Sequence, residues 1–259
     1  MIQTRLIPSA GGAILFDAAC AAQAGSGANE AFAPDWFDPA HWRALGRADA
    51  SGGGRGGVLR LDAPFGRAVL RHYRRGGLVA RLLRDRYLWT GADRSRGFAE
   101  FRLLAELAAR GLPVPAPIAA RYVRDGAFYR ADLITREIPQ SATLAQLLAS
   151  GRLDAATAAR VGATIAAFHN AGAYHADLNA HNVLLDASTV WLIDFDRGAL
   201  RTPARAWQQA NLARLERSLR KLGAGAAGEA EFERSVRAPL RAAYARELAL
   251  PLAARRSAA

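Results

Sequence analysis

The sequence predicts an α+β protein in two parts, with strands concentrated in the first part and helices in the second. In the first half, short apolar and β-branched runs alternate with turns rich in glycine, proline and aspartate. In the second half, apolar residues recur with helical spacing, most clearly over 154–170. The link is expected near 137–141, which gives a first domain at 1–137 and a second at 138–259.

The composition indicates a globular protein with an anionic partner. The chain has 259 residues, of which 51% are hydrophobic, and its single cysteine, Cys20, fits a reducing compartment. It contains no uninterrupted run of about 18 apolar residues, so a cytoplasmic protein is expected. A net charge of +12 favours nucleotide phosphates, nucleic acid or an acidic membrane surface as partner. Because only Lys221 is a lysine, a compositional bias towards arginine is an alternative explanation, and no nucleic-acid-binding motif is visible.

The strands are expected in pairs, because turn residues separate them at short spacing. Asp125-Gly126 is a typical hairpin turn, and the glycine-rich run 51–57 leads directly into the first pair. The expected hairpins are 58–61 with 68–73, 118–123 with 128–135, and 183–185 with 190–193.

Helices are expected over 77–89, 98–110, 143–148 and 154–170, and again in the last part of the chain. The first of them alternates arginines with leucines and aromatic residues. That pattern fits a helix lying at a membrane surface, and it equally fits a helix packed on the first domain with its arginines in water.

The segment YHADLNAHNVLL (174–185) carries the clearest chemical signal. His175, Asp177 and Asn182 fit H-x-D-x-x-x-x-N, and Asp194 opens an Asp-Phe-Asp where kinases carry Asp-Phe-Gly. If the third hairpin is centred near residue 188, Asn182 and Asp194 face each other at about 5 Å. They are then candidate Mg²⁺ ligands, and Asp177 is the candidate base that accepts the proton of an attacking hydroxyl. The alternative is a set of polar turns that cap a hairpin.

Two further parts of a phosphate site stand upstream. Gly52, Gly54 and Gly57 spell G-x-G-x-x-G before a strand, which predicts a loop over nucleotide phosphates. A glycine-rich hairpin turn gives the same letters. Arg71 stands on the next strand where kinases carry a lysine, and arginine also binds phosphate.

Helical periodicity selects a partner for Arg71. Over 98–110, Glu100 falls inside the apolar arc, whereas Glu106 falls on the opposite, solvated side. A carboxylate on a packed face requires a cation, so Glu100 is predicted to pair with Arg71. The alternative is that Glu100 lies at the edge of the helix.

The sequence resembles the lipopolysaccharide-core kinases, and among them the group that phosphorylates 3-deoxy-D-manno-octulosonic acid (Kdo). The stretches that carry the resemblance are HADLNAHNVLL, LIDFDRG, VLRHYRRGGLVARLLRDRYLWTG and GLPVPAPIAARY, within roughly residues 30–220. The resemblance implies a two-lobed protein-kinase-like fold, with a β-rich N-lobe, a helical C-lobe and a short activation segment. It also implies an ATP- and Mg²⁺-dependent enzyme that phosphorylates the 4-hydroxyl of Kdo on a lipid A precursor, at the cytoplasmic face of the Gram-negative inner membrane.

By the same resemblance, Asp177 is the catalytic base, Asn182 and Asp194 are the metal ligands, and Arg71 with Glu100 positions the phosphates. The implied partners are the Kdo-bearing lipid A precursor and the anionic membrane surface, with no obligate protein partner.

The sequence departs from protein kinases at two places, and these departures bear on the choice of substrate. Asp196 replaces the glycine of Asp-Phe-Gly, and no Ala-Pro-Glu follows, so a protein substrate is not expected. A heptose kinase of the same family and an aminoglycoside-type phosphotransferase remain alternatives, because the shape of the pocket selects the sugar. A third is a pseudokinase scaffold that binds nucleotide or lipid, which the arginine in place of lysine favours.

Overall fold

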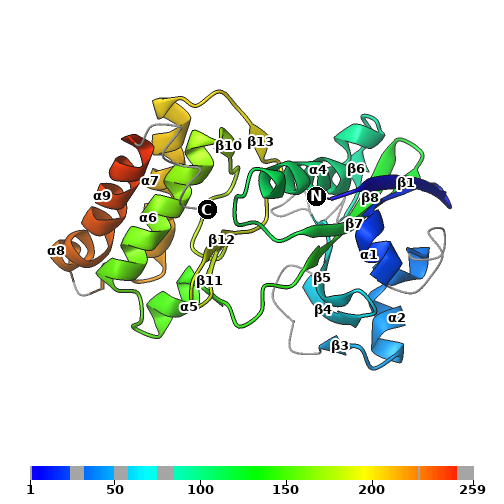
Figure 1. The fold of residues 1–259 in the computed structure, drawn as a ribbon, viewed down its shortest axis with the longest axis horizontal. Helices are drawn as coiled ribbons and strands as arrows, with labels where there is room; N and C mark the ends of the chain where they lie inside the picture. The colour runs from blue at the N-terminus through cyan, green and yellow to red at the C-terminus, as the bar shows by residue number, and fades with distance from the viewer. Residues whose placement is uncertain (1, 24–31, 50–57, 75–84, 227, 250–259) are drawn as a thin grey trace. The chain divides into compact units, whose positions relative to one another are not determined.

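The computed structural model describes residues 2–23, 32–49, 58–74, 85–226 and 228–249. The chain divides into two compact units, one made of Met1–Ala109 and Pro115–Glu137 and the other of Arg110–Val114 and Ile138–Ala259. The first unit contains a large antiparallel sheet, and the second is mainly helical with two small sheets (Figure 1). The predicted α+β class is therefore confirmed.

The sheet of the first unit has the strand order β1-β2-β7-β8-β5-β4-β3, and β6 adds to β8. All of these strand pairs are antiparallel, and two of them are the hairpins predicted from the sequence, β4 with β5 and β7 with β8. The strands are β1 (Thr4–Ser9), β2 (Gly12–Asp17), β3 (Ala48–Asp49), β4 (Val58–Ala63), β5 (Gly66–His72), β6 (Tyr87–Leu88), β7 (Pro117–Asp125) and β8 (Phe128–Arg136).

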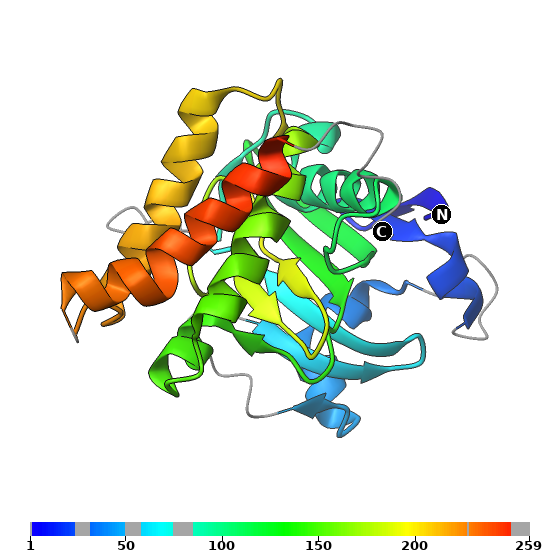
Figure 2. The ribbon, with the colours of Figure 1, turned by 60° about the vertical axis from the view of Figure 1, so that its left-hand side comes forward.

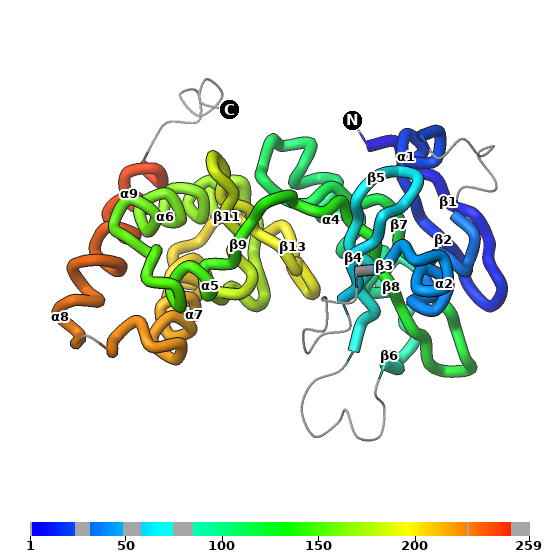
Figure 3. The backbone as a smooth tube through the Cα atoms, turned by 90° about the horizontal axis from the view of Figure 1, so that it is seen from below, coloured from blue at the N-terminus to red at the C-terminus, as the bar shows by residue number. Residues whose placement is uncertain are grey.

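The N-terminal segment and one long helix pack against this sheet. The short helices α1 (Ala18–Gln23), η1 (Pro34–Phe37) and α2 (Pro39–Ala44) contribute to a core that includes the buried rings of Phe32, Phe37 and Trp42. Figure 3 shows α2 beside β3. The helix α4 (Arg96–Ala109), which follows the turn η2 (Ala92–Arg94), packs on β7 and β8.

Two parts of the first unit differ from the sequence prediction. The strands β1 and β2 were not predicted. In β2 every residue from Ala13 to Phe16 is buried, so the run shows no alternation, whereas β1 is mostly exposed and contains Pro8. The helix expected over 77–89 is wrong at its C-terminal end, where Tyr87 and Leu88 form β6 and pair with Tyr129 and Phe128. Residues 77–84 of that prediction lie outside the described residues.

The second unit is built around two packed helices. Helix α9 lies across α6 (Figure 2), and a Cβ added at Gly162 would meet the carbonyl oxygen of Leu240 at 2.0 Å, so the two backbones are in close contact. The helices are α5 (Leu144–Ala149), α6 (Ala155–Asn170), α7 (Arg205–Lys221), α8 (Glu229–Phe232), the π-helical turn η3 (Glu233–Arg237) and α9 (Ala238–Ala249). Within the described residues, no helix is both long enough and apolar enough to cross a membrane.

The small sheets of the second unit carry the polar motif. The predicted third hairpin is present as β11 (Val183–Leu185) and β12 (Val190–Leu192), and β9 (Ala142–Thr143) extends it. A separate pair joins β10 (Ala173–Tyr174) to β13 (Ala199–Leu200). The predicted helix starts agree with the caps, since Thr143 forms a capping box with Gln146 and Asp154 accepts from the amide of Thr157.

We expect acid to destabilise the second unit through His169. Its imidazole is buried and lies 2.9 Å from the hydroxyl of Tyr244, and burial lowers its pKa to about 4 from an ordinary value of 6.5. Between these two values the unfolded chain binds the additional proton, so stability falls as the pH falls from 6.5 towards 4, by up to about 3 kcal/mol.

The measurement is the free energy of unfolding from pH 7 to pH 4 for the wild type and for His169→Gln, which should lose less stability over that range. His181→Gln, at an exposed position, is the control. An equal acid dependence of wild type and His169→Gln would contradict the prediction.

Candidate active site

The first unit joins the two charged residues predicted to pair. Arg71, on β5, forms an ion pair with Glu100 on α4, and the side chain of Glu100 is only 2% exposed. The hydroxyl of Tyr73 donates to Glu100 at 2.7 Å and accepts from Arg71 at 3.1 Å, and the guanidinium also lies over the Tyr73 ring. A buried carboxylate thus has two donors, which is the arrangement that makes its charge tolerable in the interior. Glu106 is exposed, as predicted.

The close packing of α4 on the sheet requires a glycine. A Cβ added at Gly97 would meet the carbonyl oxygen of Asp132 at 2.8 Å and that of Arg121 at 3.3 Å. Gly97 and Glu100 are three residues apart and therefore lie on the same face of the helix. The glycine consequently lets this face of α4, which carries Glu100, lie close against β7 and β8.

His72, next to Arg71, lies between two carboxylates. Its Nδ1 is 2.6 Å from Asp132 and its Nε2 is 3.1 Å from Asp85, and Arg121 binds the other oxygen of Asp132 at 2.8 Å. The hydrogen bond to Asp132 raises the pKa of His72, so the ring retains its proton at a higher pH than usual. This network ties the end of β5 to β7 and β8.

The predicted glycine motif, Gly52, Gly54 and Gly57, lies outside the described residues. The two strands that this stretch connects, β3 and β4, are paired antiparallel. The function of the motif stays a prediction.

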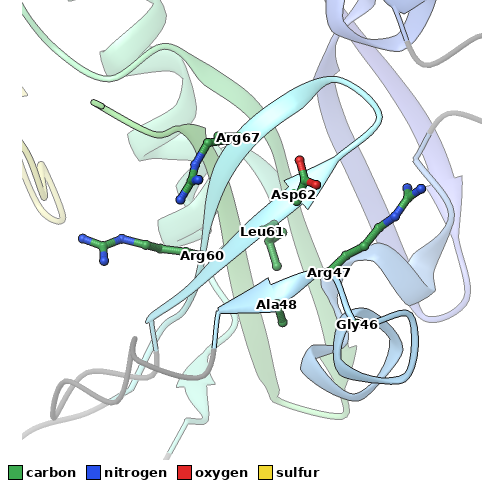
Figure 4. A pocket seen from close by; sticks show the side chains of 7 residues that line it. All are labelled: Gly46, Arg47, Ala48, Arg60, Leu61, Asp62 and Arg67. Carbon is green, nitrogen blue, oxygen red and sulfur yellow. The ribbon is translucent and has the colours of Figure 1, made fainter. Parts of the chain in front are cut away.

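A cavity of about 250 Å³ lies beside β3 and β4, and three of its lining residues are arginines (Figure 4). Arg60 and Arg67 point to one side and both bind Glu137, at 3.0 and 2.6 Å, whereas Arg47 points away from them. One carboxylate therefore binds two of these arginines and offsets one of their two positive charges.

The second unit holds Asp177 in a defined orientation while leaving it accessible. Its side chain is 64% exposed, and Arg214 of α7 binds one carboxylate oxygen at 3.3 Å. Asn179 donates to the other oxygen at 3.1 Å and accepts from the amide of His181 at 2.8 Å. An exposed carboxylate with its two oxygens fixed is suited to orient a hydroxyl and take its proton.

The register of the third hairpin differs from the prediction by one residue. The amide of Ile193 donates to the carbonyl of Asn182 at 3.1 Å, so Ile193, and not Asp194, lies opposite Asn182. The cause is the turn, in which the amide of Asp186 donates to the carbonyl of Thr189, so the reversal is centred between two residues and not on one.

Asp194 departs from the extended path of the strand. Its φ is 62°, a left-handed conformation that costs a non-glycine residue about 1–2 kcal/mol. The alternation of strand side chains therefore ends at Ile193 and does not decide where the Asp194 carboxylate points. Asn182 uses its amide nitrogen to donate to the carbonyl of Asp177 at 3.0 Å, which turns its amide oxygen to the other side.

His175 lies close to both aspartates. Burial lowers the pKa of its imidazole, and the nearby carboxylates of Asp194 and Asp177 offset part of that shift. Asp177 and Asp194 thus lie near one histidine, and Asn182 is bonded to the main chain of Asp177. Sequence reasoning missed Arg214 and the part played by Asn179, because the first comes from a helix 37 residues away and the second depends on a local turn.

Known proteins resemble this chain over most of its length. The family described as "Lipopolysaccharide kinase (Kdo/WaaP) family" matches residues 40–237. The 3-deoxy-D-manno-octulosonic acid kinase of Xanthomonas campestris pv. campestris (strain B100) is 52% identical over 213 residues, which cover 82% of this chain and 81% of the relative. The kinase of the same name from Stenotrophomonas maltophilia (strain R551-3) is 51% identical over the same shares.

A solved structure shares the fold. WaaP in complex with acyl carrier protein superimposes with a TM-score of 0.50 at 17% identity, covering 82% of this chain and 84% of that one. At this identity, the likeness concerns the fold alone.

We expect Glu100→Gln to destabilise the protein by about 3 kcal/mol, because Arg71 is half-buried and loses its counter-charge. Glu106→Gln on the same helix removes the same charge from an exposed position and should change the stability by less than about 0.5 kcal/mol. Denaturant unfolding of the two variants measures the difference. Equal effects would mean that the Arg71–Glu100 pair contributes nothing specific.

Proposed function

This chain belongs to the lipopolysaccharide kinase (Kdo/WaaP) family, and from that premise we propose that it phosphorylates Kdo on a lipid A precursor with ATP as phosphoryl donor. As a member of this family, the protein is a phosphotransferase. Relatives about half identical in sequence carry the name of Kdo kinase, which supports Kdo over heptose or an aminoglycoside as the acceptor. The proposed position of transfer is the 4-hydroxyl.

The observation that carries the proposal is the environment of Asp177. Its carboxylate is exposed to an incoming acceptor, and Arg214 and Asn179 hold it in one orientation. In the proposed reaction, Asp177 orients the sugar hydroxyl and accepts its proton as the hydroxyl oxygen bonds to the γ-phosphorus of ATP and the bond from that phosphorus to the leaving ADP breaks. A phosphoryl acceptor thereby becomes a better nucleophile without a covalent enzyme intermediate.

The residues of both units fit Mg²⁺ and ATP. Asn182 and Asp194 carry side-chain oxygen atoms, which are the ligands that Mg²⁺ prefers. Because the amide nitrogen of Asn182 is bonded to the carbonyl of Asp177, the amide oxygen of Asn182 is left to bind the metal. When bound, Mg²⁺ neutralises charge on the transferring phosphoryl group. In the first unit, Arg71 is held by Glu100 and is suited to bind phosphate, and Gly52, Gly54 and Gly57 are proposed to lie over the phosphates.

We assign the two parts as the lobes of a protein-kinase-like fold, with the N-lobe at residues 1–137 and the C-lobe at 138–259. The sequence of strands, α4 and two further strands before Glu137 supports the N-lobe, and the hairpin with Asp194 supports the C-lobe. Residues 195–204, between Asp194 and α7, are the proposed short activation segment.

We place the reaction at the cytoplasmic face of the inner membrane, where a lipid A precursor is accessible to a peripheral protein. The net charge of +12 supports binding to an anionic surface.

Asp177→Asn should lower kcat at least about a hundredfold, because the amide cannot accept the hydroxyl proton. The assay follows ADP release with ATP, Mg²⁺ and a Kdo-bearing lipid A precursor, and mass spectrometry of the lipid locates the added phosphate. Asp154→Asn is the matched control, since asparagine caps α6 as well as aspartate does. Full turnover by Asp177→Asn would refute the mechanism, whereas transfer only to a heptose acceptor would refute the substrate.

A further inference from the structure

The segment that follows Asp194 is exposed and rich in arginine. Between Asp196 and the start of α7 it carries Arg197 and Arg201, and both side chains are exposed. Arg205, at the start of α7, instead lines a separate groove of about 600 Å³ between α7 and α9. Arg197 and Arg201 are therefore the two arginines that belong to the segment between Asp196 and α7.

Backbone contacts hold this segment in place. Strand β13 within it pairs with β10, and the amide of Arg201 donates to the carbonyl of Gly172 at 2.8 Å. A Cβ added at Gly172 would meet the carbonyl oxygen of Arg201 at 2.4 Å, so the approach requires glycine there. The indole of Trp207 donates to the carbonyl of Thr202 at 3.0 Å. The segment thus follows a fixed path alongside β10.

Arg201 is stacked on the aromatic ring that opens the polar motif. Its guanidinium lies 3.5 Å from the centre of the Tyr174 ring, and Tyr174 precedes Asp177 by three residues. Stacking uses the flat face of the guanidinium and leaves the N–H groups at its edge directed outward. A pre-oriented fork of donors fits a carboxylate or a phosphate.

Arg197 adopts a strained backbone conformation three residues after Asp194. Its φ is 59°, and among the described residues only Gln140, Asp194 and Arg197 are non-glycine residues with positive φ. Strain of this kind persists where the surrounding structure imposes it and is concentrated at functional sites. Position 197 thus carries a long cationic side chain, although glycine would adopt this φ without strain.

No carboxylate of the described residues neutralises either arginine. In the described part of the chain, no carboxylate forms an ion pair with Arg197 or Arg201, whereas Arg214 is bound to Asp177 and Arg220 to Glu229. Two guanidinium groups without a carboxylate partner among the described residues, on the segment paired with the strand that leads to Asp177, attract an anion.

We propose that Arg197 and Arg201 form the subsite for an anionic group of the acceptor, a carboxylate or a phosphate. This inference rests on the proposed function, since it concerns the same acceptor. The sugar carboxylate of Kdo and the phosphates of the lipid are the two sources of such a group. In either case, the fixed segment holds the anion while Asp177 meets the hydroxyl.

The test measures the KM for a Kdo-bearing lipid A precursor in Arg201→Ala and in Arg197→Gly. Each should raise the KM about tenfold to a hundredfold, as expected for a lost charged hydrogen bond. Arg197→Gly relieves the strained φ, so its thermal midpoint should not fall, which separates binding from folding. Arg246→Ala, which removes an equally exposed charge from α9, is the control and should leave the KM unchanged.

Modified acceptors identify the source of the anion. If the carboxylate binds here, the methyl ester of Kdo should be a poor acceptor for the wild type and should lose nothing further in Arg201→Ala. If the phosphates bind here, the dephosphorylated lipid should behave in that way instead. Losses in the variants that are equal for every acceptor, or no loss at all, would overturn the proposal.

Equilibrium binding of the same acceptors without ATP separates this proposal from the proposed reaction. If the wild type transfers no phosphate to Kdo, the proposed function fails. The subsite proposal is supported if Arg197→Gly and Arg201→Ala weaken binding of the anionic acceptor but not of the acceptor that lacks the anionic group. It is refuted if they do not.

Discussion

The candidate site of the second unit depends on the two hydrogen bonds of the buried His175 imidazole. Its Nδ1 accepts from the amide of Asp177 at 3.1 Å, which places the ring proton on Nε2, and Nε2 donates to the carbonyl of Ile193 at 2.9 Å. The bond that Nδ1 accepts requires the neutral ring, in agreement with a pKa lowered by burial. The ring therefore ties the loop of the proposed base to Ile193, which follows β12 and precedes Asp194, and the ring of Phe195 packs against the imidazole at a tilt of 52°.

The first unit meets a comparable constraint by different means. There, a charge is buried: the carboxylate of Glu100 sits on the packed face of α4 and is compensated by Arg71 and Tyr73. Only the absence of a side chain at Gly97 lets the helix approach the sheet closely enough. In one unit an imidazole without charge joins two segments, and in the other a compensated ion pair does so. Both arrangements position charged groups without leaving a buried charge unpaired.

Local signals account for most of what the sequence predicted. Hairpin turns, helix caps and the spacing of the polar motif are each set within a few residues, and the structure contains those elements. The failures were non-local or depended on fine geometry. The strand before Asp17 is buried on both faces and shows no alternation, Tyr87 joins a strand because β8 offers an edge, and Arg214 reaches Asp177 through tertiary packing. The one-residue error in register came from a turn whose centre lies between two residues.

The positive charge of the chain is easier to interpret when the arginines that are bound to carboxylates are distinguished from those that are not. Several are bound to carboxylates and serve the fold, as Arg121, Arg220 and Arg241 do. The proposed reaction brings an anionic acceptor towards Asp177 and Asp194, which would repel it. Arg214 offsets the charge of Asp177 directly, and Arg197 and Arg201 add positive potential on the segment alongside. An arginine-rich composition alone does not predict such a distribution, because it requires fixed positions next to the carboxylates.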